Sequence, residues 1–109
     1  MVQTDQVLTI TKDDAGKISN YVRLRGSYCG IHVPTIDTAI CYLRGSLDPN
    51  GTTSGRIQLE DGSAALNLAS GVGGKFWTIP ARIPFQWVAV EVSATQTTSD
   101  VVFRITAKE

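Results

Sequence analysis

The chain has 109 residues, a length that supports one hydrophobic core and one domain. Ten basic residues balance ten acidic ones, and a formal net charge of zero excludes the basic surface that generic binding to nucleic acid or anionic membranes requires. Charged residues make up only 18% of the chain, while Thr, Ser, Gly and the β-branched aliphatic residues are abundant, a composition typical of all-β domains and of surfaces buried in assemblies.

The N-terminus shows no targeting or membrane signal. No apolar run approaches the ~20 residues of a membrane span, and residues 1–5 lack the basic end and apolar block of a signal peptide. We therefore expect a soluble protein that is made in the cytosol and has no membrane partner. Residues 1–5 also lack periodicity, which predicts a flexible N-terminal arm before a single domain over residues 6–109.

The first part of the domain alternates apolar runs with turn residues. Gln6–Thr11 places Leu8 and Ile10 on one face, which predicts the first strand. Lys12–Gly16 is a turn cluster that includes a glycine. Lys17–Leu24 is compatible with helical spacing, but its asparagine and β-branched residues favour an extended segment.

The stretch from Tyr28 to Gly51 predicts a hairpin around which the rest of the chain is organised. Two β-favouring runs flank the short connection Pro34–Asp37, and the second run ends in the turn sequence Asp48–Gly51. A loop centred on Thr35 pairs Ile31 with Ala39 and places alternate residues of both runs on one face. The residues of this face, which we take to be core, are Cys29, Ile31, Ala39, Cys41 and Leu43.

The two cysteines admit one intramolecular pairing. The predicted hairpin places Cys29 opposite Cys41, where a cross-strand disulfide is geometrically possible. A chain without an export signal folds in a reducing compartment, where a buried cysteine is more often a small apolar side chain. We therefore favour two free, buried thiols over a bridge.

The middle of the chain carries further strand and turn signals. Alternation of polar and apolar residues predicts strands, and glycine pairs predict turns between them. The expected elements are a half-exposed strand at Arg56–Glu60, a hairpin turn at Asp61-Gly62, a returning strand at Ser63–Leu68, a loop at Gly71–Gly74 and an edge or irregular strand at Lys75–Ile79.

The last two strands have the clearest patterns. Trp87–Ser93 places three valines, at positions 88, 90 and 92, on one face. Val101–Thr106 places Val101, Phe103 and Ile105 inward, and a polar loop at 94–100 joins the two strands. Seven to nine short strands without a convincing helix predict an all-β fold, an antiparallel β-sandwich of jelly-roll or Greek-key type.

No pattern in the sequence predicts catalysis. The single histidine, His32, lies on the face of its strand opposite to the cysteines, so the pleat prevents a shared zinc site. It also lacks an acidic partner at a diagnostic spacing, and we predict a surface or interface histidine rather than a general base. A calcium site on Asp48, Asn50 and Asp61 rests on three scattered loop residues, so we predict no metal, no cofactor and no enzyme activity.

Aromatic residues around the bend at Pro80–Pro84 suit sugar stacking or a subunit interface. For Phe76 and Phe85 a core position is an equal alternative, so Trp77 and Trp87 are the better contacts with a partner. The full set of predicted partner-contact residues is Val2, Gln3, Thr4, Trp77, Ile79 and Trp87.

Four segments resemble, in the same order, a family of small structural proteins of tailed bacteriophages and prophages. The resemblance covers most of the chain from Leu24 onward, with Ser27 inserted before a tyrosine and Pro49-Asn50 inserted before a glycine. The segments are Leu24–Tyr28, Gly30–Pro34, Tyr42–Gly51 and Trp87–Val92.

This resemblance implies a virion structural protein, made in the host cytoplasm and located in the virion. It implies a capsid decoration (cement) protein or head-fibre base, a β-sandwich that forms a homotrimer on the major capsid protein or another virion protein and does not contact nucleic acid. An alternative function is a carbohydrate-binding or tail-associated receptor-binding module that stacks ligands on Trp77, Trp87 and Tyr42. A third is a small hydrolase with His32 as its base.

Overall fold

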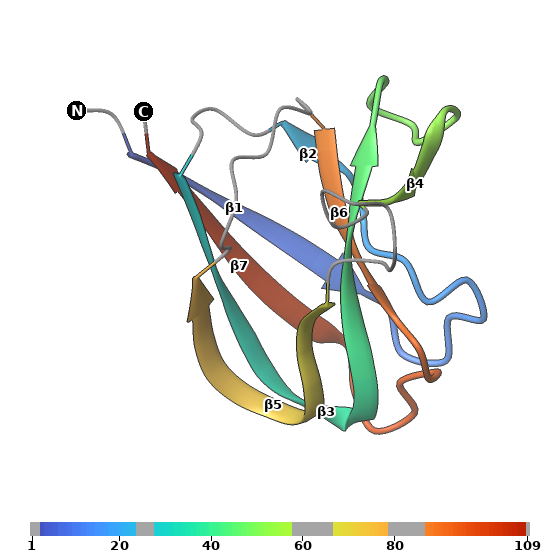
Figure 1. Cartoon of the computed structure of the whole chain (residues 1–109). Helices are drawn as coiled ribbons and strands as arrows, with labels where there is room; N and C mark the ends of the chain where they lie inside the picture. Colours follow the sequence, from blue (N-terminus) through green and yellow to red (C-terminus); the bar gives the residue numbers. More distant parts are fainter. Residues whose placement is uncertain (1–2, 24–27, 58–66, 79–86, 109) are drawn as a thin grey trace.

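The structure, a computed structural model, describes residues 3–23, 28–57, 67–78 and 87–108. Within these ranges the regular elements are all β-strands (Figure 1), so the predicted all-β class is confirmed. The same ranges contain no helix that is long and apolar enough to cross a membrane. The strands are β1 (Gln3–Ile10), β2 (Val22–Arg23), β3 (Tyr28–Ser46), β4 (Ser54–Arg56), β5 (Asn67–Thr78), β6 (Trp87–Val92) and β7 (Val101–Lys108).

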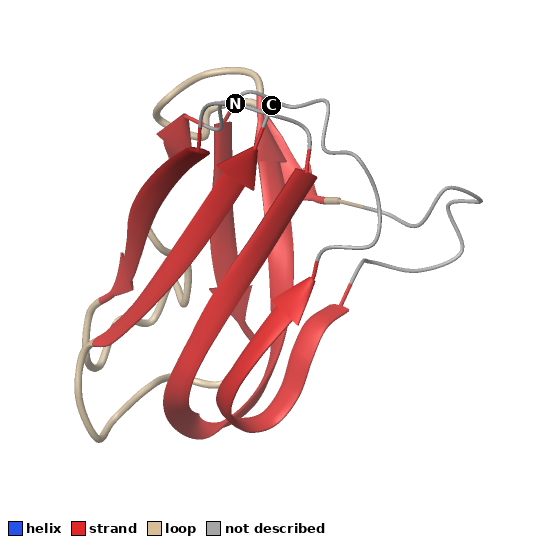
Figure 2. Cartoon of the chain, turned by 90° about the vertical axis from the view of Figure 1, so that its left-hand side faces the viewer, coloured by secondary structure: helices blue, strands red, loops and turns tan. Residues whose placement is uncertain are grey.

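The strands form one antiparallel sheet that is nearly closed into a barrel (Figure 2). The strand order is β1-β7-β3-β6-β2. β7 and β6 pair with successive segments along one edge of the long strand β3, and β4 and β5 pair with its opposite edge. Asn20 bridges the two ends of this order, because its amide donates to the Val7 carbonyl (3.3 Å) and accepts from the Thr9 N–H (2.8 Å). The sandwich topology and the range of seven to nine strands stay predictions.

β3 is one continuous strand of 19 residues, and the predicted hairpin turn at Pro34–Asp37 is wrong. The first half, Tyr28–His32, pairs with β7, and the second half, Cys41–Ser46, pairs with β6. β5 runs along the opposite edge of both halves. The local turn signal is overridden because continuing the strand gives both halves two neighbouring strands.

The predicted pairings of Ile31 with Ala39 and of Cys29 with Cys41 are therefore wrong as well. Cys29 and Ile31 lie opposite residues of β7. Ala39 and Cys41 lie farther along the same strand, β3, and so cannot pair with them. The Cys41 thiol is free, as favoured from the sequence, and it is fully buried.

β3 keeps a bend where the turn was expected, and β5 bends with it (Figure 1). The register between the two strands shifts between Thr35 and Ala39. Gly71, Gly73 and Gly74 lie inside β5 with φ values of 101°, 73° and 77°, a backbone conformation that glycine adopts without a steric penalty. The loop predicted at these glycines is wrong, because they let a paired strand follow the bend.

The connection at 93–100 covers the bend of β3 between the segments that pair with β6 and β7. Gln96 is only 1% exposed, and its amide accepts from the Asp37 N–H (2.8 Å) and donates to the Asp37 carbonyl (3.2 Å). The Asp37 carboxylate accepts from the Thr98 hydroxyl (2.6 Å) and the Thr97 N–H (2.7 Å), and these bonds lower its pKa. The predicted loop is confirmed, and its hydrogen bonds attach it to the bend of β3.

The core lies inside the curved sheet and contains the predicted inward faces of β1, β6 and β7. β6 is more buried than expected, because Ala89 on its other face is also 0% exposed. The buried apolar cluster consists of Leu8, Ile10, Val22, Ile31, Val33, Ile36, Ala39, Cys41, Leu43, Val88, Val90, Val92, Val101, Phe103, Ile105 and Ala107.

Other elements differ from expectation at their ends. The predicted arm contributes Gln3–Asp5 to β1, where these residues pair with Thr106–Lys108 of β7. Within the described part of the extended segment expected at Lys17–Leu24, residues 17–23, the structure has the two-residue β2 and an isolated bridge at Ile18. β4 ends at Arg56, where the next strand was expected to begin.

The turn at Asp48–Gly51 is confirmed, with φ of 71° at its glycine. The turn at Lys12–Gly16 is also present, although Asp13 rather than the glycine has a positive φ, of 64°. Several predictions fall on residues outside the described ranges, namely those for Val2, Asp61-Gly62, most of Ser63–Leu68, Ile79 and Phe85.

Candidate functional site

Of the predicted partner-contact residues, the structure describes Gln3, Thr4, Trp77 and Trp87, which lie on three different strands. Gln3 and Thr4 lie in β1, opposite the end of β7. Trp77 lies in β5 and pairs with the first half of β3, whereas Trp87 begins β6 and pairs with the end of the second half. Trp87 is half-buried. These residues are therefore distributed over distant parts of the sheet.

Phe76 of β5 is the most exposed large apolar residue in the part of the chain that the structure describes. Its exposed fraction is 85%, so the alternative of a core position is wrong for this residue. Phe76 lies opposite His32 of β3, and the two ring centroids are 4.5 Å apart with an interplanar angle of 39°. His32 is half-buried beneath this ring, which agrees with a surface or interface histidine.

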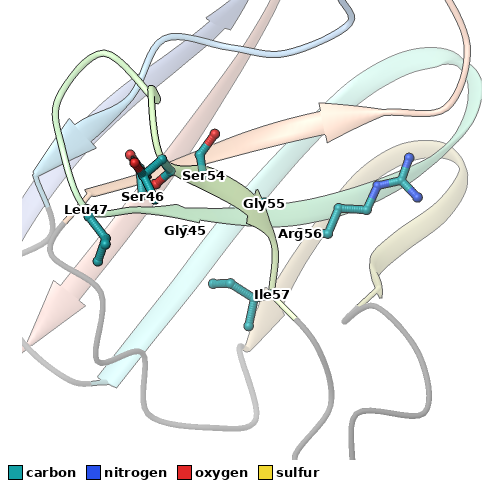
Figure 3. Close-up of a pocket in the computed structure, with 8 residues that line it drawn as sticks. Gly45, Ser46, Leu47, Ser54, Gly55, Arg56 and Ile57 are labelled. Atoms are coloured by element: carbon teal, nitrogen blue, oxygen red, sulfur yellow. Dashed lines mark hydrogen bonds between the residues drawn. The ribbon is translucent and has the colours of Figure 1, made fainter.

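A pocket of about 500 Å³ lies where β3 pairs with β4, and we call it the β3–β4 pocket. Leu47 and Ile57 supply its apolar side chains, which lie on the same side of the two strands (Figure 3). Gly45 lies opposite Gly55 between them, and a Cβ added at Gly55 would meet no atom within 4 Å. Leu47 is 73% exposed and Gly55 is exposed, whereas Gly45 is buried, so the pocket offers an apolar wall beside the exposed backbone of Gly55.

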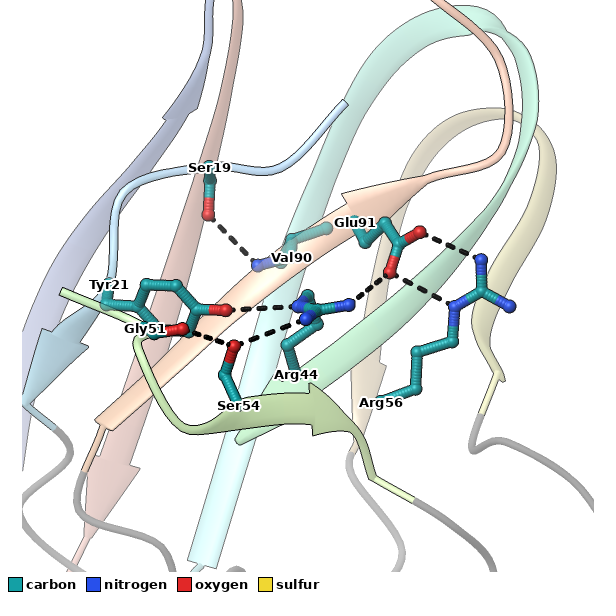
Figure 4. Close-up of polar contacts among 8 residues, drawn as sticks. All are labelled: Ser19, Tyr21, Arg44, Gly51, Ser54, Arg56, Val90 and Glu91. Carbon is teal, nitrogen blue, oxygen red and sulfur yellow. Dashed lines mark hydrogen bonds and ion pairs between the residues drawn. The ribbon is translucent and has the colours of Figure 1, made fainter. Parts of the chain in front are cut away.

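A polar cluster joins β3, β4 and β6 (Figure 4). Glu91, with a side chain only 12% exposed, forms an ion pair with Arg56 (2.8 Å) and another with Arg44 (2.8 Å). Hydrogen bonds from Arg56 and then from Arg44 lower the pKa of the Glu91 carboxyl. Two positive charges thus share one carboxylate.

The same arginines contact two tyrosines. The Arg56 guanidinium lies 3.9 Å from the centroid of the Tyr42 ring, a cation–π contact that covers one face of this ring. Arg44 donates to the Tyr21 hydroxyl (3.0 Å) and to the Ser54 hydroxyl (3.3 Å). The cluster therefore connects β4 and the segment before β2 to the central strands, and its geometry is that of a structural network.

The hypothetical calcium ligands are used in a turn instead. The Asp48 carboxylate accepts from the backbone N–H groups of Thr53 (3.0 Å), Thr52 (3.1 Å) and Asn50 (3.1 Å). These bonds, with that from Thr53 the strongest, lower the pKa of Asp48 to about 2. Asp61 lies outside the described ranges, and within them no three metal-binding side chains come together.

The structure gives neither Cys41 nor His32 the surroundings of a nucleophile and its general base. Cys41 is 0% exposed, and burial raises the pKa of its thiol to about 11, which opposes formation of a thiolate. The ring contact of His32 is with Phe76, on the outer surface. Neither geometry fits an activated nucleophile.

The described residues thus define a class of protein, a small all-β domain with a nearly closed antiparallel sheet and two uncovered apolar features. The chain matches no protein-family model, no curated protein and no solved structure.

Sequence reasoning left the exposure of Phe76 open and missed the β3–β4 pocket. Adjacent residues of a strand point to opposite faces, so either Phe76 or its neighbour Trp77 had to face outward, but the pattern did not show which. The β3–β4 pocket gave no signal because its lining includes the pair Gly45 and Gly55, 10 positions apart in sequence, which only the strand register brings together.

Proposed function

We propose that this chain is a virion structural protein of a tailed bacteriophage, a capsid decoration (cement) protein that binds the outer surface of the head as a homotrimer. The identity of its target, the major capsid protein or another virion protein, comes from the resemblance of four segments described above. The proposal assigns no catalytic residue and no cofactor to the chain. Its mechanism is adhesion between surfaces.

The observation that carries an adhesive role is the exposure of large apolar side chains on a domain without net charge. Phe76 is 85% exposed and Leu47 is 73% exposed, while the net charge of the chain is zero. Water leaves apolar surface favourably when a partner covers it, so a partner that covers either side chain gains binding free energy. A lattice of repeated contacts then multiplies a weak affinity at each site.

The edge of β1 supplies a second means of attachment. Within the described ranges β1 pairs only with β7, and on its other edge Asn20 bonds to Val7 and Thr9. The backbone of Gln3–Gln6 lies beyond this bridge. A strand from a neighbouring virion protein could extend the sheet there, because an edge of this kind is a template for strand addition.

Two measurements on the purified chain test the proposal. Light scattering or native mass spectrometry should give the mass of a trimer. Capsids of the same virus that lack the protein should then bind it to saturation and carry it down on sedimentation, and unlabelled chain should displace labelled chain. A chain that stays in the supernatant at every capsid concentration would contradict the capsid role.

The alternative, a carbohydrate-binding or receptor-binding module, is favoured by one observation. The Phe76 ring is exposed, and it is held by its contact with His32, which suits stacking against a sugar face. The expected platform of Trp77, Trp87 and Tyr42 receives less support, because the Arg56 guanidinium covers one face of Tyr42. Glycan binding by the chain as a monomer, lost in Phe76→Ala, would favour this function over the capsid role.

A further inference from the structure

Two apolar features of this chain complement each other but lie too far apart to meet within one molecule. The ring of Phe76 stands on the C-terminal half of β5, opposite the first half of β3. The β3–β4 pocket lies at the other end of β3, and Figure 1 places β4 and that half of β5 on different sides of the molecule. We propose that Phe76 of one copy inserts into the β3–β4 pocket of a second copy.

Phe76 has the properties of an anchor residue. Its position is fixed by the pairing with His32 and by a ring contact at 4.5 Å, so little conformational freedom remains to be lost on binding. At 85% exposure, nearly the whole side chain is available to be buried. Aromatic side chains of this kind dominate interface energetics because each buries a large apolar area.

The β3–β4 pocket has the properties of the receiving site. A volume of about 500 Å³ accommodates an aromatic side chain, and Leu47 and Ile57 provide apolar walls. Gly55 carries no side chain, is exposed and has open space at its Cβ position, so a ring can approach its backbone. Ile57 also packs against the core, which links the pocket to the rigid part of the domain.

The contact is heterologous, since each copy presents its ring to one neighbour and its pocket to another. Such contacts close into a ring of copies when the rotation between neighbours allows it. A chain with ten basic and ten acidic residues has no net charge to oppose this self-association. The inference rests on the homo-oligomer in the proposed function, and it names the residues that form the contact.

Complementing variants test this arrangement. Phe76→Ser removes the ring, and Gly55→Leu fills the pocket at a position where a side chain meets open space. Each variant alone should associate about tenfold more weakly or worse, since burial of the ring is lost. An equimolar mixture should form a dimer and nothing larger, because one intact ring meets one intact pocket. Val102→Ser, at a valine 39% exposed on β7, is the matched control and should assemble as the unmodified chain does.

A photoreactive phenylalanine analogue at position 76 gives a direct measurement. It should crosslink to Leu47 or Ile57 of another copy. The inference is overturned if the unmodified chain is monomeric, if both variants assemble normally, if the mixture stays monomeric, or if the crosslinks map elsewhere. A trimer that survives both variants and still sediments with capsids would refute this contact and leave the proposed function standing. If the contact between Phe76 and the pocket is confirmed but the chain does not bind capsids, the contact stands and the proposed capsid function is refuted.

Discussion

Gln96 holds the bend of β3, and Gln96→Met should therefore be strongly destabilising. Methionine nearly preserves the size of the side chain but removes its amide. The amide accepts from the Asp37 N–H (2.8 Å) and donates to the carbonyls of Asp37 (3.2 Å) and Ala94 (3.0 Å). At about 1 kcal/mol for each bond, in a site where Gln96 is 1% exposed, we expect a loss of about 3 kcal/mol in the free energy of unfolding.

Urea denaturation followed by tryptophan fluorescence measures this loss. With a slope of about 1.5 kcal/mol/M, the midpoint should fall by roughly 2 M while the slope stays unchanged. Gln6→Met, at a half-buried glutamine of β1, is the matched control and should change the free energy by less than about 0.5 kcal/mol. A loss below about 1 kcal/mol in Gln96→Met would refute the structural role of the amide.

Three further predictions follow from single positions. The pKa of Asp48 is lowered from 3.8 to about 2, so its carboxylate stabilises the fold above about pH 4, and this contribution is lost as the pH falls from about 4 to 2. Urea titrations at several pH values measure this dependence. In Asp48→Asn the free energy of unfolding should change less over that pH range. In a Cys29→Ser background, Cys41 should resist iodoacetamide at pH 8 and react once urea unfolds the chain, because burial raises the pKa of its thiol to about 11. Gly73→Ala should lower the free energy of unfolding by about 2 kcal/mol or more, since φ is 73° and the new Cβ would lie 2.1 Å from a backbone oxygen of β3, whereas Gly55→Ala should be nearly neutral in the same denaturation assay.

The inward faces of β1, β6 and β7 could be predicted because they depend only on alternation. Leu8 and Ile10, the valines of β6, and Val101, Phe103 and Ile105 of β7 are all buried as expected. In each case a short run of period two lies between turn residues. Such a pattern fixes the buried face of a strand wherever the strand pairs.

The path of β3 could not be predicted because it depends on partners distant in sequence. Pro34–Asp37 has the composition of a turn, yet the strand continues, since β5 and the 93–100 loop satisfy the backbone through the bend. The glycines of β5 predict a loop from composition alone, because their strand partner, β3, is distant in sequence. Their positive φ values serve a bent strand, a use of glycine that composition does not distinguish from a turn.

Two side-chain amides explain how an incompletely paired sheet remains ordered. Gln96 bonds to the N–H and carbonyl of Asp37, and Asn20 bonds to the carbonyl of Val7 and the N–H of Thr9. An amide carries one acceptor and two donor hydrogens in the arrangement of a peptide unit, so each side chain pairs with the backbone as a one-residue strand would. Asn20 covers β1 only at its C-terminal end, and the N-terminal end of the same edge is where a strand from another chain would continue the sheet.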